Sequence, residues 1–344
     1  MTATPSMLDR AVAALTGLAI GDALGMPSQT LNRDEIRNRY GEITGFVSPF
    51  PDHPVSHGLS AGQVTDDTEQ MLILAQCLID GNGRVDETLF ARDLLDWEAG
   101  IKARGLLDLL GPSSKAALNA MLAGEPVTTS GRKGTTNGAA MRIAPVGIAT
   151  PVSDVPEFVH QVELACRLTH NTGEAIAAAA AVAAVVSCGI EGSSFEAAIP
   201  IALRAAEEGQ RRGFSVGEED MAGRLSSALS DAHRHRDPGE FAAKVGTSVA
   251  SHESIAAAFG IVRLAAGDPW QSALISANIG DDTDTIGAIA GAMAGACTGL
   301  ASIPDDAIET IQTANELPLE ETARGVLALR QRALADEELW ATGT

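Results

Sequence analysis

The stretch of sequence that decides the fold is GDDTDTIGAIAGAMAGACTGLASI, residues 280–303. Residues 286–303 carry no charge and consist mainly of alanine and glycine. These eighteen residues reach the length of a membrane span, but their small side chains and the aspartates directly before them favour a buried core helix. Glycine recurs at every fourth position, which predicts a helix face that a neighbouring helix can approach closely. The glycines on this face are Gly287, Gly291, Gly295 and Gly299.

The rest of the chain also predicts helices. Residues 31–63 differ, because they hold many glycines and prolines and so predict a long surface loop. Residues 142–148 alternate weakly, but Pro145 argues against a central strand. The fold class is therefore predicted to be all-α. Apolar residues at helical spacing predict helices at about 8–20, 66–79, 86–100, 113–123, 155–168, 174–188, 194–209, 219–231, 239–245, 253–265, 270–277, 285–300, 305–314 and 319–337.

The composition supports a helical protein and argues against a nucleic-acid-binding one. Hydrophobic residues make up 45% of the 344 residues and aromatic residues only 3%, so small aliphatic side chains must fill the core. The formal net charge of -21 repels polyanions. We therefore expect no nucleic-acid partner and no membrane association, while the oligomeric state is not readable from the sequence.

The cysteines and the N-terminus predict a cytoplasmic protein. The four cysteines lie far apart and form no CxxC pair, which is typical of buried thiols in a reducing compartment. The apolar run at residues 11–20 lacks a basic region before it and leads directly into Gly21 and Asp22, so it does not resemble a signal peptide.

Two short segments concentrate oxygen ligands, TDDTEQ at residues 65–70 and GDDTDTIG at 280–287. Each places aspartate and threonine directly before an apolar helix. Helix capping explains either segment alone, and Asp66 with Glu69 has the spacing of a capping box. Capping needs one carboxylate, whereas the two segments together offer five aspartates. If the helix starts meet, repulsion among these groups favours bound divalent cations, and oxygen-only ligands indicate Mg²⁺ or Mn²⁺ rather than zinc.

Five motifs follow one another along nearly the whole chain. They are GLAIGDALGMPSQ from Gly17, TDDTEQM from Thr65, TNGAAMRIAPVG from Thr136, LTHNTGEAI from Leu168 and NIGDDTDTIGAIAGAMAGA from Asn278. In content and order they resemble the ADP-ribosylglycohydrolase family, which includes the enzyme that reactivates dinitrogenase reductase. The resemblance implies a single domain over residues 1–344, folded as a compact orthogonal multi-helix bundle with a dinuclear metal site in a central cleft.

The resemblance also implies a role for individual residues. Two divalent cations, Mg²⁺ or Mn²⁺, would hold the hydroxyls of the distal ribose and position the attacking water, with Asp66 and Asp67 counted as catalytic. Their ligands would be Thr65, Asp66, Asp67, Asp282, Asp284 and Thr285. The substrate-binding residues would be Gln29, Asn137, Gly138, Met141 and His170.

Several of these residues have a simpler interpretation when they are considered without the family. The segment at residues 134–142 is an ordinary turn before Pro145, and Arg142 is equally a structural ion-pair partner. A lone histidine near a helix start, such as His170, is more often a structural hydrogen-bonding group than a catalyst. Asp22 is expected to support the site, through a contact to the first metal-binding helix.

The sequence departs from the family at the group that would move the proton. Many members have a glutamate where this chain has Gln29, and an amide does not accept a proton from water. Others have an aspartate where Leu109 aligns, one residue after Asp108. A one-residue shift turns a helical side chain by about 100°, which argues against Asp108 reaching the site, although it stays a candidate catalytic residue. Asp281 replaces a more usual glycine.

Three functions are compatible with this pattern. The first is metal-dependent hydrolysis of a ribosyl glycosidic bond that removes ADP-ribose from a modified protein or small acceptor. The second is an N-ribosidase acting on a nucleoside or ribosylated metabolite, and the third is a catalytically weak ADP-ribose binder. We favour the first, in which the substrate is an ADP-ribosylated protein or a small ribosylated molecule.

Overall fold

A computed structural model describes residues 4–106, 110–217 and 219–342. Of residues 336–342 it describes the backbone only. Within these ranges the chain forms α-helices, one short 3-10 helix and no strand. Extended pairing in the same ranges is limited to two isolated bridges, between Thr136 and Ala250 and between Thr172 and Phe214. The prediction of an all-α fold is confirmed.

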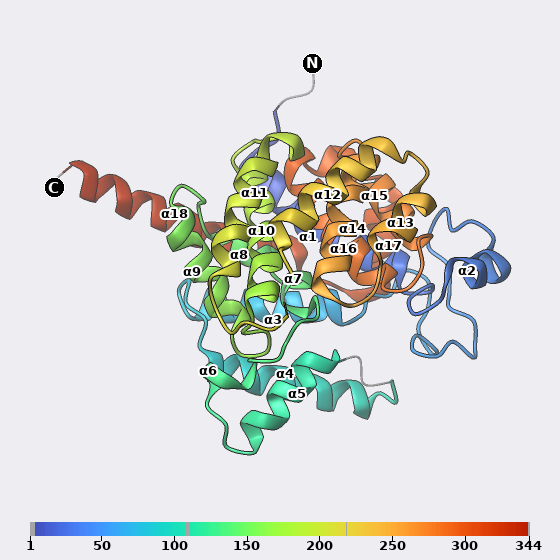
Figure 1. Ribbon diagram of the computed structural model, residues 1–344, viewed down its shortest axis with the longest axis horizontal. Coiled ribbons are helices and arrows are strands. Elements are labelled where there is room, and N and C mark those ends of the chain that lie inside the picture. Colours follow the sequence, from blue (N-terminus) through green and yellow to red (C-terminus); the bar gives the residue numbers. More distant parts are fainter. Residues whose placement is uncertain (1–3, 107–109, 218, 343–344) are drawn as a thin grey trace.

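The helices surround a centre made by α1 and α16, with α4 and α5 forming a layer beyond α3, and with α2 and α18 on opposite sides (Figure 1). The elements, in chain order, are α1 (Met7–Gly25), α2 (Arg33–Tyr40), α3 (Asp66–Asp80), α4 (Glu87–Ala103), α5 (Pro112–Leu122), α6 (Val127–Ser130), α7 (Gly138–Met141), α8 (Ala144–Ala149), α9 (Val155–Cys166), α10 (Gly173–Ile190), α11 (Phe195–Gln210), α12 (Met221–Arg234), α13 (Pro238–Val245), α14 (Ser251–Leu264), α15 (Pro269–Ala277), α16 (Thr283–Thr298), η1 (Leu300–Ser302), α17 (Asp305–Asn315) and α18 (Leu319–Thr342).

The central pair α1 and α16 is antiparallel, and its two backbones touch. A Cβ atom added to Gly21 would lie 2.0 Å from the carbonyl oxygen of Gly287, and one added to Gly17 would lie 2.3 Å from that of Gly291. The predicted glycine face therefore admits a neighbouring helix, as expected from small residues at close helix crossings. Gly299 differs from the other three, because it ends α16 with a φ of 85°.

Helix α10 packs beside this pair and is buried along its whole length. Among the described helices it alone is long and apolar enough to cross a membrane, and all of it lies inside the protein. Alanine makes up much of its sequence, so neighbouring helices pack against it closely. It is a core helix, as α16 is.

Two predictions about local structure were wrong. The expected loop at residues 31–63 contains α2, whose capping box joins Asn32 and Glu35. This helix buries only Ile36, so it lacks the repeated apolar positions that predict a helix. Helix α3 does begin at Asp66, but its N-cap is Thr65. The side chain of Glu69 accepts a hydrogen bond from Trp97 Nε1 and does not close a capping box.

The four cysteines are buried and free, as predicted. Burial raises the pKa of Cys166 and of Cys297 to about 12, so both stay protonated thiols at neutral pH. They behave as small apolar groups in the core.

Candidate active site

The two aspartate-rich segments meet in space. The hydroxyl of Thr285, in the first turn of α16, lies 3.4 Å from Asp67 Oδ2 in the first turn of α3. Burial, followed by the charges of Asp66 and Asp284, raises the pKa of Asp67 well above its usual value. Carboxylates separated by more than 200 residues in the sequence thus share one buried site.

Capping does not account for these carboxylates. The N-cap residues Thr65 of α3 and Asp282 of α16 make no side-chain capping hydrogen bond to their own helices. Asp67 Oδ1 is buried and has no hydrogen-bond partner among the described residues. A buried, unpaired carboxylate oxygen is costly, so the site has more negative charge than the surrounding protein neutralises.

Asp22 of α1 takes over the capping of α3. It is fully buried, and its carboxylate accepts hydrogen bonds from the backbone N–H groups of Thr65, at 3.0 Å, and Thr68, at 3.1 Å. It also accepts from the hydroxyls of Thr65, at 2.8 Å, and Thr68, at 2.6 Å. Burial raises the pKa of Asp22 to about 6, although these hydrogen bonds oppose the rise. The expected contact of Asp22 with the helix that begins at Asp66 is confirmed.

Packing against the end of α1 holds the start of α16. A Cβ atom on Gly25 would lie 2.4 Å from the backbone of Thr283 and Asp284. The hydroxyl of Thr283 donates to the carbonyl of Gly25 at 2.9 Å. Asp281, directly before this turn, has a φ of 60°, a left-handed conformation that glycine and aspartate adopt at least cost. This conformation suits glycine as well as aspartate.

Asn137 forms one wall of the site. Its amide nitrogen donates to the carboxylate of Asp282 and, at 3.0 Å, to Ser254 Oγ. Its backbone N–H donates to the carbonyl of Val249 at 3.0 Å, which fixes the loop before α7. Asn137 therefore orients Asp282, whose pKa burial raises to about 6. Met141, at the end of α7, is buried.

His170 is fully buried beside Gly138 and is held on both sides. One ring nitrogen, Nδ1, lies 2.8 Å from Thr169 Oγ1, and the other, Nε2, lies 3.0 Å from Thr136 Oγ1. Burial and the charge of Arg142 lower the pKa of His170 well below its usual value, so the ring is neutral at pH 7. A Cβ atom on Gly138 would lie 2.9 Å from the ring, so this position requires glycine.

A chain of hydrogen bonds, which the sequence did not reveal, joins α3 to this wall. Gln70 Nε2 donates to Asp66 Oδ2 at 3.0 Å, and Gln70 Oε1 accepts from Arg142 Nη1 at 2.7 Å. Arg142 Nη2 donates to Thr169 Oγ1 at 2.6 Å. The guanidinium of Arg142 is fully buried and makes no ion pair with a described carboxylate, so the ion-pair interpretation was wrong. Gln70 belongs to the TDDTEQ motif, and that membership is the one signal that could have drawn attention to it.

The amide of Gln29 has a fixed orientation. Ser56 Oγ lies 2.7 Å from the carbonyl oxygen of Met26, which can only accept, so the hydroxyl donates there. The atom of Gln29 that lies 3.0 Å from Ser56 Oγ must therefore be the donor Nε2. This leaves Gln29 Oε1 as the acceptor that points away from Ser56. Asp108, the other sequence candidate for proton transfer, lies outside the described residues.

The donor set suits a hard divalent cation. The hydroxyls of Thr65 and Thr285 lie 3.3 and 3.4 Å from Asp67 Oδ2, while Asp67 Oδ1 has no partner among the described residues. Mg²⁺ and Mn²⁺ prefer carboxylate and hydroxyl oxygens of this kind. Among the described residues, no three Asp, Glu, His or Cys side chains converge closely enough to enclose one ion as they stand. The chemistry of the residues therefore fits a cation, and small side-chain rotations would have to complete its coordination.

Comparison with known proteins places this chain within a family. A sequence model of the family described as ADP-ribosylglycohydrolase matches residues 3–338. The uncharacterized protein YegU of Escherichia coli is 35% identical over 329 residues, which cover 94% of this chain and 98% of that protein. The ADP-ribosyl-[dinitrogen reductase] glycohydrolase of Rhodospirillum rubrum is 28% identical, over 94% of this chain and 98% of its own length.

A solved structure has the same fold. It is named an ADP-ribosylglycohydrolase-related protein complex, and it superimposes with a TM-score of 0.69 at 25% identity, covering 94% of this chain and 99% of its own. The family model and the relatives agree in matching nearly the whole chain. The chain belongs to the ADP-ribosylglycohydrolase family and is a glycosidic-bond hydrolase of that type.

Proposed function

We propose that this enzyme removes ADP-ribose from a modified protein or a small acceptor, and that it requires two divalent cations, Mg²⁺ or Mn²⁺. One observation carries the proposal. Two helix starts bring their aspartates into one buried site without using them as caps, and leave Asp67 Oδ1 without a partner. The family supports hydrolysis of ADP-ribosyl bonds, and the name of the Rhodospirillum rubrum relative supports an ADP-ribosylated protein as the substrate class.

The proposed cation ligands come from both helix starts. When bound, the cations would lower the pKa of a bound water and orient the ribose hydroxyls. The ligands would be Thr65, Asp66, Asp67, Asp282, Asp284 and Thr285. Asn137 and Gln70 would keep Asp282 and Asp66 in place, because each already donates a hydrogen bond to one of these carboxylates.

The chain's own residues divide the remaining tasks. Gln29 Oε1 accepts a hydrogen bond from a water or a ribose hydroxyl but takes no proton, so it orients that group. Asn137, Gly138, Met141 and neutral His170 form the wall against which the substrate lies, with both nitrogens of His170 engaged by threonines. We assign the catalytic role to Asp66 and Asp67, and Asp108 remains the further proposed base.

The first experiment measures release of free ADP-ribose or ribose from ADP-ribosylated peptides and from nucleosides, with Mg²⁺, with Mn²⁺ and with EDTA. We expect metal-dependent release of ADP-ribose from one class of peptide, with loss of at least about 100-fold in Asp66→Ala and Asp284→Ala. Release from nucleosides alone would favour the N-ribosidase. Tight binding of ADP-ribose without turnover would favour a binder.

The role of Gln29 is tested by two variants. In Gln29→Glu a carboxylate replaces the amide, which supplies the proton acceptor that many family members have. We expect turnover to rise in Gln29→Glu if proton transfer limits the reaction. Ser56→Ala removes the hydroxyl that fixes the amide, and we expect it to raise KM more than it lowers kcat. Unchanged kcat and KM in both variants would show that Gln29 takes no part in substrate binding or catalysis.

A further inference from the structure

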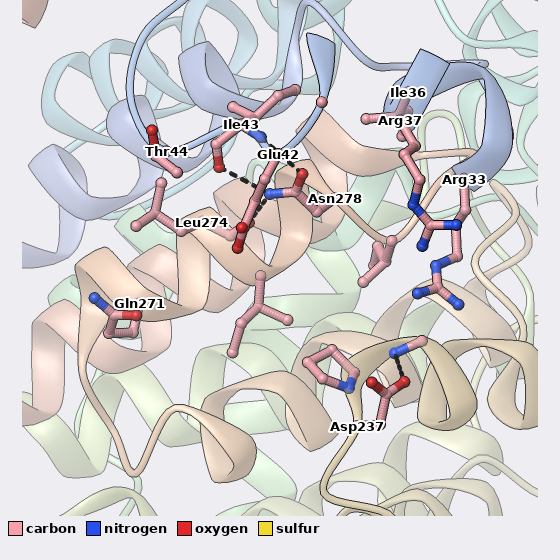
Figure 2. Close-up of a pocket in the computed structure, with 15 residues that line it drawn as sticks. Arg33, Ile36, Arg37, Glu42, Ile43, Thr44, Asp237, Gln271, Leu274 and Asn278 are labelled. Atoms are coloured by element: carbon pink, nitrogen blue, oxygen red, sulfur yellow. Dashed lines mark hydrogen bonds between the residues drawn. The ribbon is translucent and has the colours of Figure 1, made fainter. Parts of the chain in front are cut away.

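A separate cavity of about 500 Å³ lies between α2, α13 and α15 (Figure 2). None of the proposed metal ligands or substrate-binding residues lines it. One part of its wall is apolar, formed by residues that include Ile36, Ile43, Leu274 and Ile275. Arg33 and Arg37 enter it from another side, on one face of α2 (Figure 2). The cavity is within the size range of small-molecule sites in proteins.

Arg33 is held in place without a counter-ion. Its guanidinium lies against the start of α13, because a Cβ atom on Gly239 would come within 1.8–1.9 Å of three guanidinium atoms. Its own Cγ packs near Gly280, where an added Cβ atom would lie at 3.2 Å. Among the described residues it makes no hydrogen bond and no ion pair within 4.0 Å through its side chain. Arg33 therefore lines the cavity with a guanidinium group that has no partner among the described residues.

Arg37 adds a second positive charge on the same face of the helix. Residues four apart on a helix are neighbours, and Figure 2 shows both side chains on the same side of the cavity. The ion pair that Arg37 makes is a 3.7 Å contact with Asp34, and both side chains are exposed. Exposed pairs of this kind contribute little. The chain has 45 acidic residues against 24 lysines and arginines, yet these two arginines at one cavity are only weakly neutralised.

The carboxylates on the cavity wall do not neutralise these arginines. Asp237 accepts hydrogen bonds from the backbone N–H groups of Gly239, at 2.9 Å, and Glu240, at 2.8 Å, and so caps α13. Glu42 lines the cavity as well. Neither lies within 4.0 Å of a guanidinium nitrogen of Arg33 or Arg37. The cavity therefore offers a cationic wall and an apolar wall to the same ligand.

We propose that this cavity binds a small phosphate-bearing molecule, with the phosphate on Arg33 and Arg37 and the rest of the molecule on the apolar wall. Arginine is well suited to this role, because its planar group donates parallel hydrogen bonds to phosphate oxygens. The proposal is independent of the proposed function, since the cavity shares no residue with the aspartate site.

The test is calorimetric titration of the full-length protein with inorganic phosphate and with phenyl phosphate, in EDTA so that no cation-bound phosphate contributes. We expect phenyl phosphate to bind more tightly than phosphate, because its ring reaches the apolar wall. Arg33→Ala should weaken both by at least about tenfold. Absence of binding at millimolar concentrations, or equal binding by Arg33→Ala, would overturn the proposal.

Two further variants distinguish loss of this binding site from a general loss of positive charge or of folding. Arg39→Ala removes one positive charge from the same helix but does not line the cavity, so we expect unchanged binding. Gly239→Ala places a methyl group where the Arg33 guanidinium lies, while alanine is a better helix former, so binding should fall without a loss of stability. Weakening in Arg39→Ala equal to that in Arg33→Ala would show that only overall charge matters.

Discussion

The starts of α3 and α16 carry similar sequences but are held by different interactions. Both begin with aspartate and threonine, and neither uses its own N-cap side chain. Hydrogen bonds from Asp22 hold α3, whereas the backbone of Gly25 packs against the start of α16. Both supports come from the last two turns of α1. The comparison shows that one helix positions both helix starts, so that the other aspartates are not needed as caps.

The largest effect is expected from breaking the contact between Gly25 and the start of α16. In Gly25→Ala the new methyl group would lie 2.4 Å from the backbone of Thr283 and Asp284, and backbone does not move aside as a flexible side chain does. We expect a loss of about 3 kcal/mol or more in the free energy of unfolding, measured by urea denaturation. The matched control is Gly100→Ala in α4, where an added Cβ atom meets nothing within 4 Å.

Gly100→Ala should stabilise the protein by about 0.5–1 kcal/mol, because alanine favours the helix interior more than glycine does. A loss in Gly25→Ala no greater than about 0.5 kcal/mol would show that the start of α16 is not held by this contact.

A somewhat smaller effect is expected from removing the hydrogen bonds that Asp22 accepts from α3. Asp22→Ala leaves two backbone N–H groups and two hydroxyls of α3 without their acceptor. We expect a net loss of about 3 kcal/mol in the free energy of unfolding. The lost hydrogen bonds alone would cost more, but the repulsion of Asp22 with Asp66 and Asp284 disappears too. Asp22→Asn, which keeps one oxygen, should lose less. Equal losses in the two variants would contradict a hydrogen-bonding role.

The shared carboxylates predict that cations stabilise the protein more as the pH rises. The pKa values of Asp22 and Asp282 are raised to about 6 in the folded protein, so the folded state binds more protons than the unfolded state between about pH 4 and 6. The stability that comes from this tighter proton binding in the folded state is therefore lost as the pH rises through about 6. Bound Mg²⁺ or Mn²⁺ would offset that loss.

We expect the rise in Tm on adding Mn²⁺ to be large at pH 7.5, corresponding to about 2–3 kcal/mol at saturating cation, and small at pH 4.5. Measuring each pH with cation and with EDTA removes the effect of other titrating groups. The rise should be absent in Asp284→Ala. An equal rise in Tm at both pH values would show that cation binding does not depend on the ionisation of these carboxylates.

The smallest effect is expected at Asp281, the residue directly before the turn into α16. Its left-handed backbone favours glycine, while its Oδ2 accepts a hydrogen bond from Thr247 at 2.9 Å. These effects oppose each other, so Asp281→Gly should change stability by less than about 1 kcal/mol and leave activity unchanged. A large fall in ADP-ribose release would instead give Asp281 a part in orienting the water.

Much of the fold could be predicted because it depends on local patterns. The apolar spacing predicted a helix at residues 270–277, and α15 spans Pro269–Ala277. Helix α2 was missed because its residues are mostly charged and its one buried side chain, Ile36, leaves no periodic signal. Helices α6, α7 and α8 were missed because four to six residues are too few to show a helical period.

The sequence by itself determined that the protein is all-α, that α16 is a buried core helix with a glycine face, and that two aspartate-rich helix starts are the chemically unusual segments. These properties follow from the order of residue types along one segment. Only the tertiary structure decided that Asp22 replaces the local caps, that Arg142 and Gln70 tie Asp66 to the wall, and that Ser56 orients the amide of Gln29. Such contacts join residues far apart in the chain, and they form only when packed helices bring their polar groups within hydrogen-bonding distance in a site that excludes water.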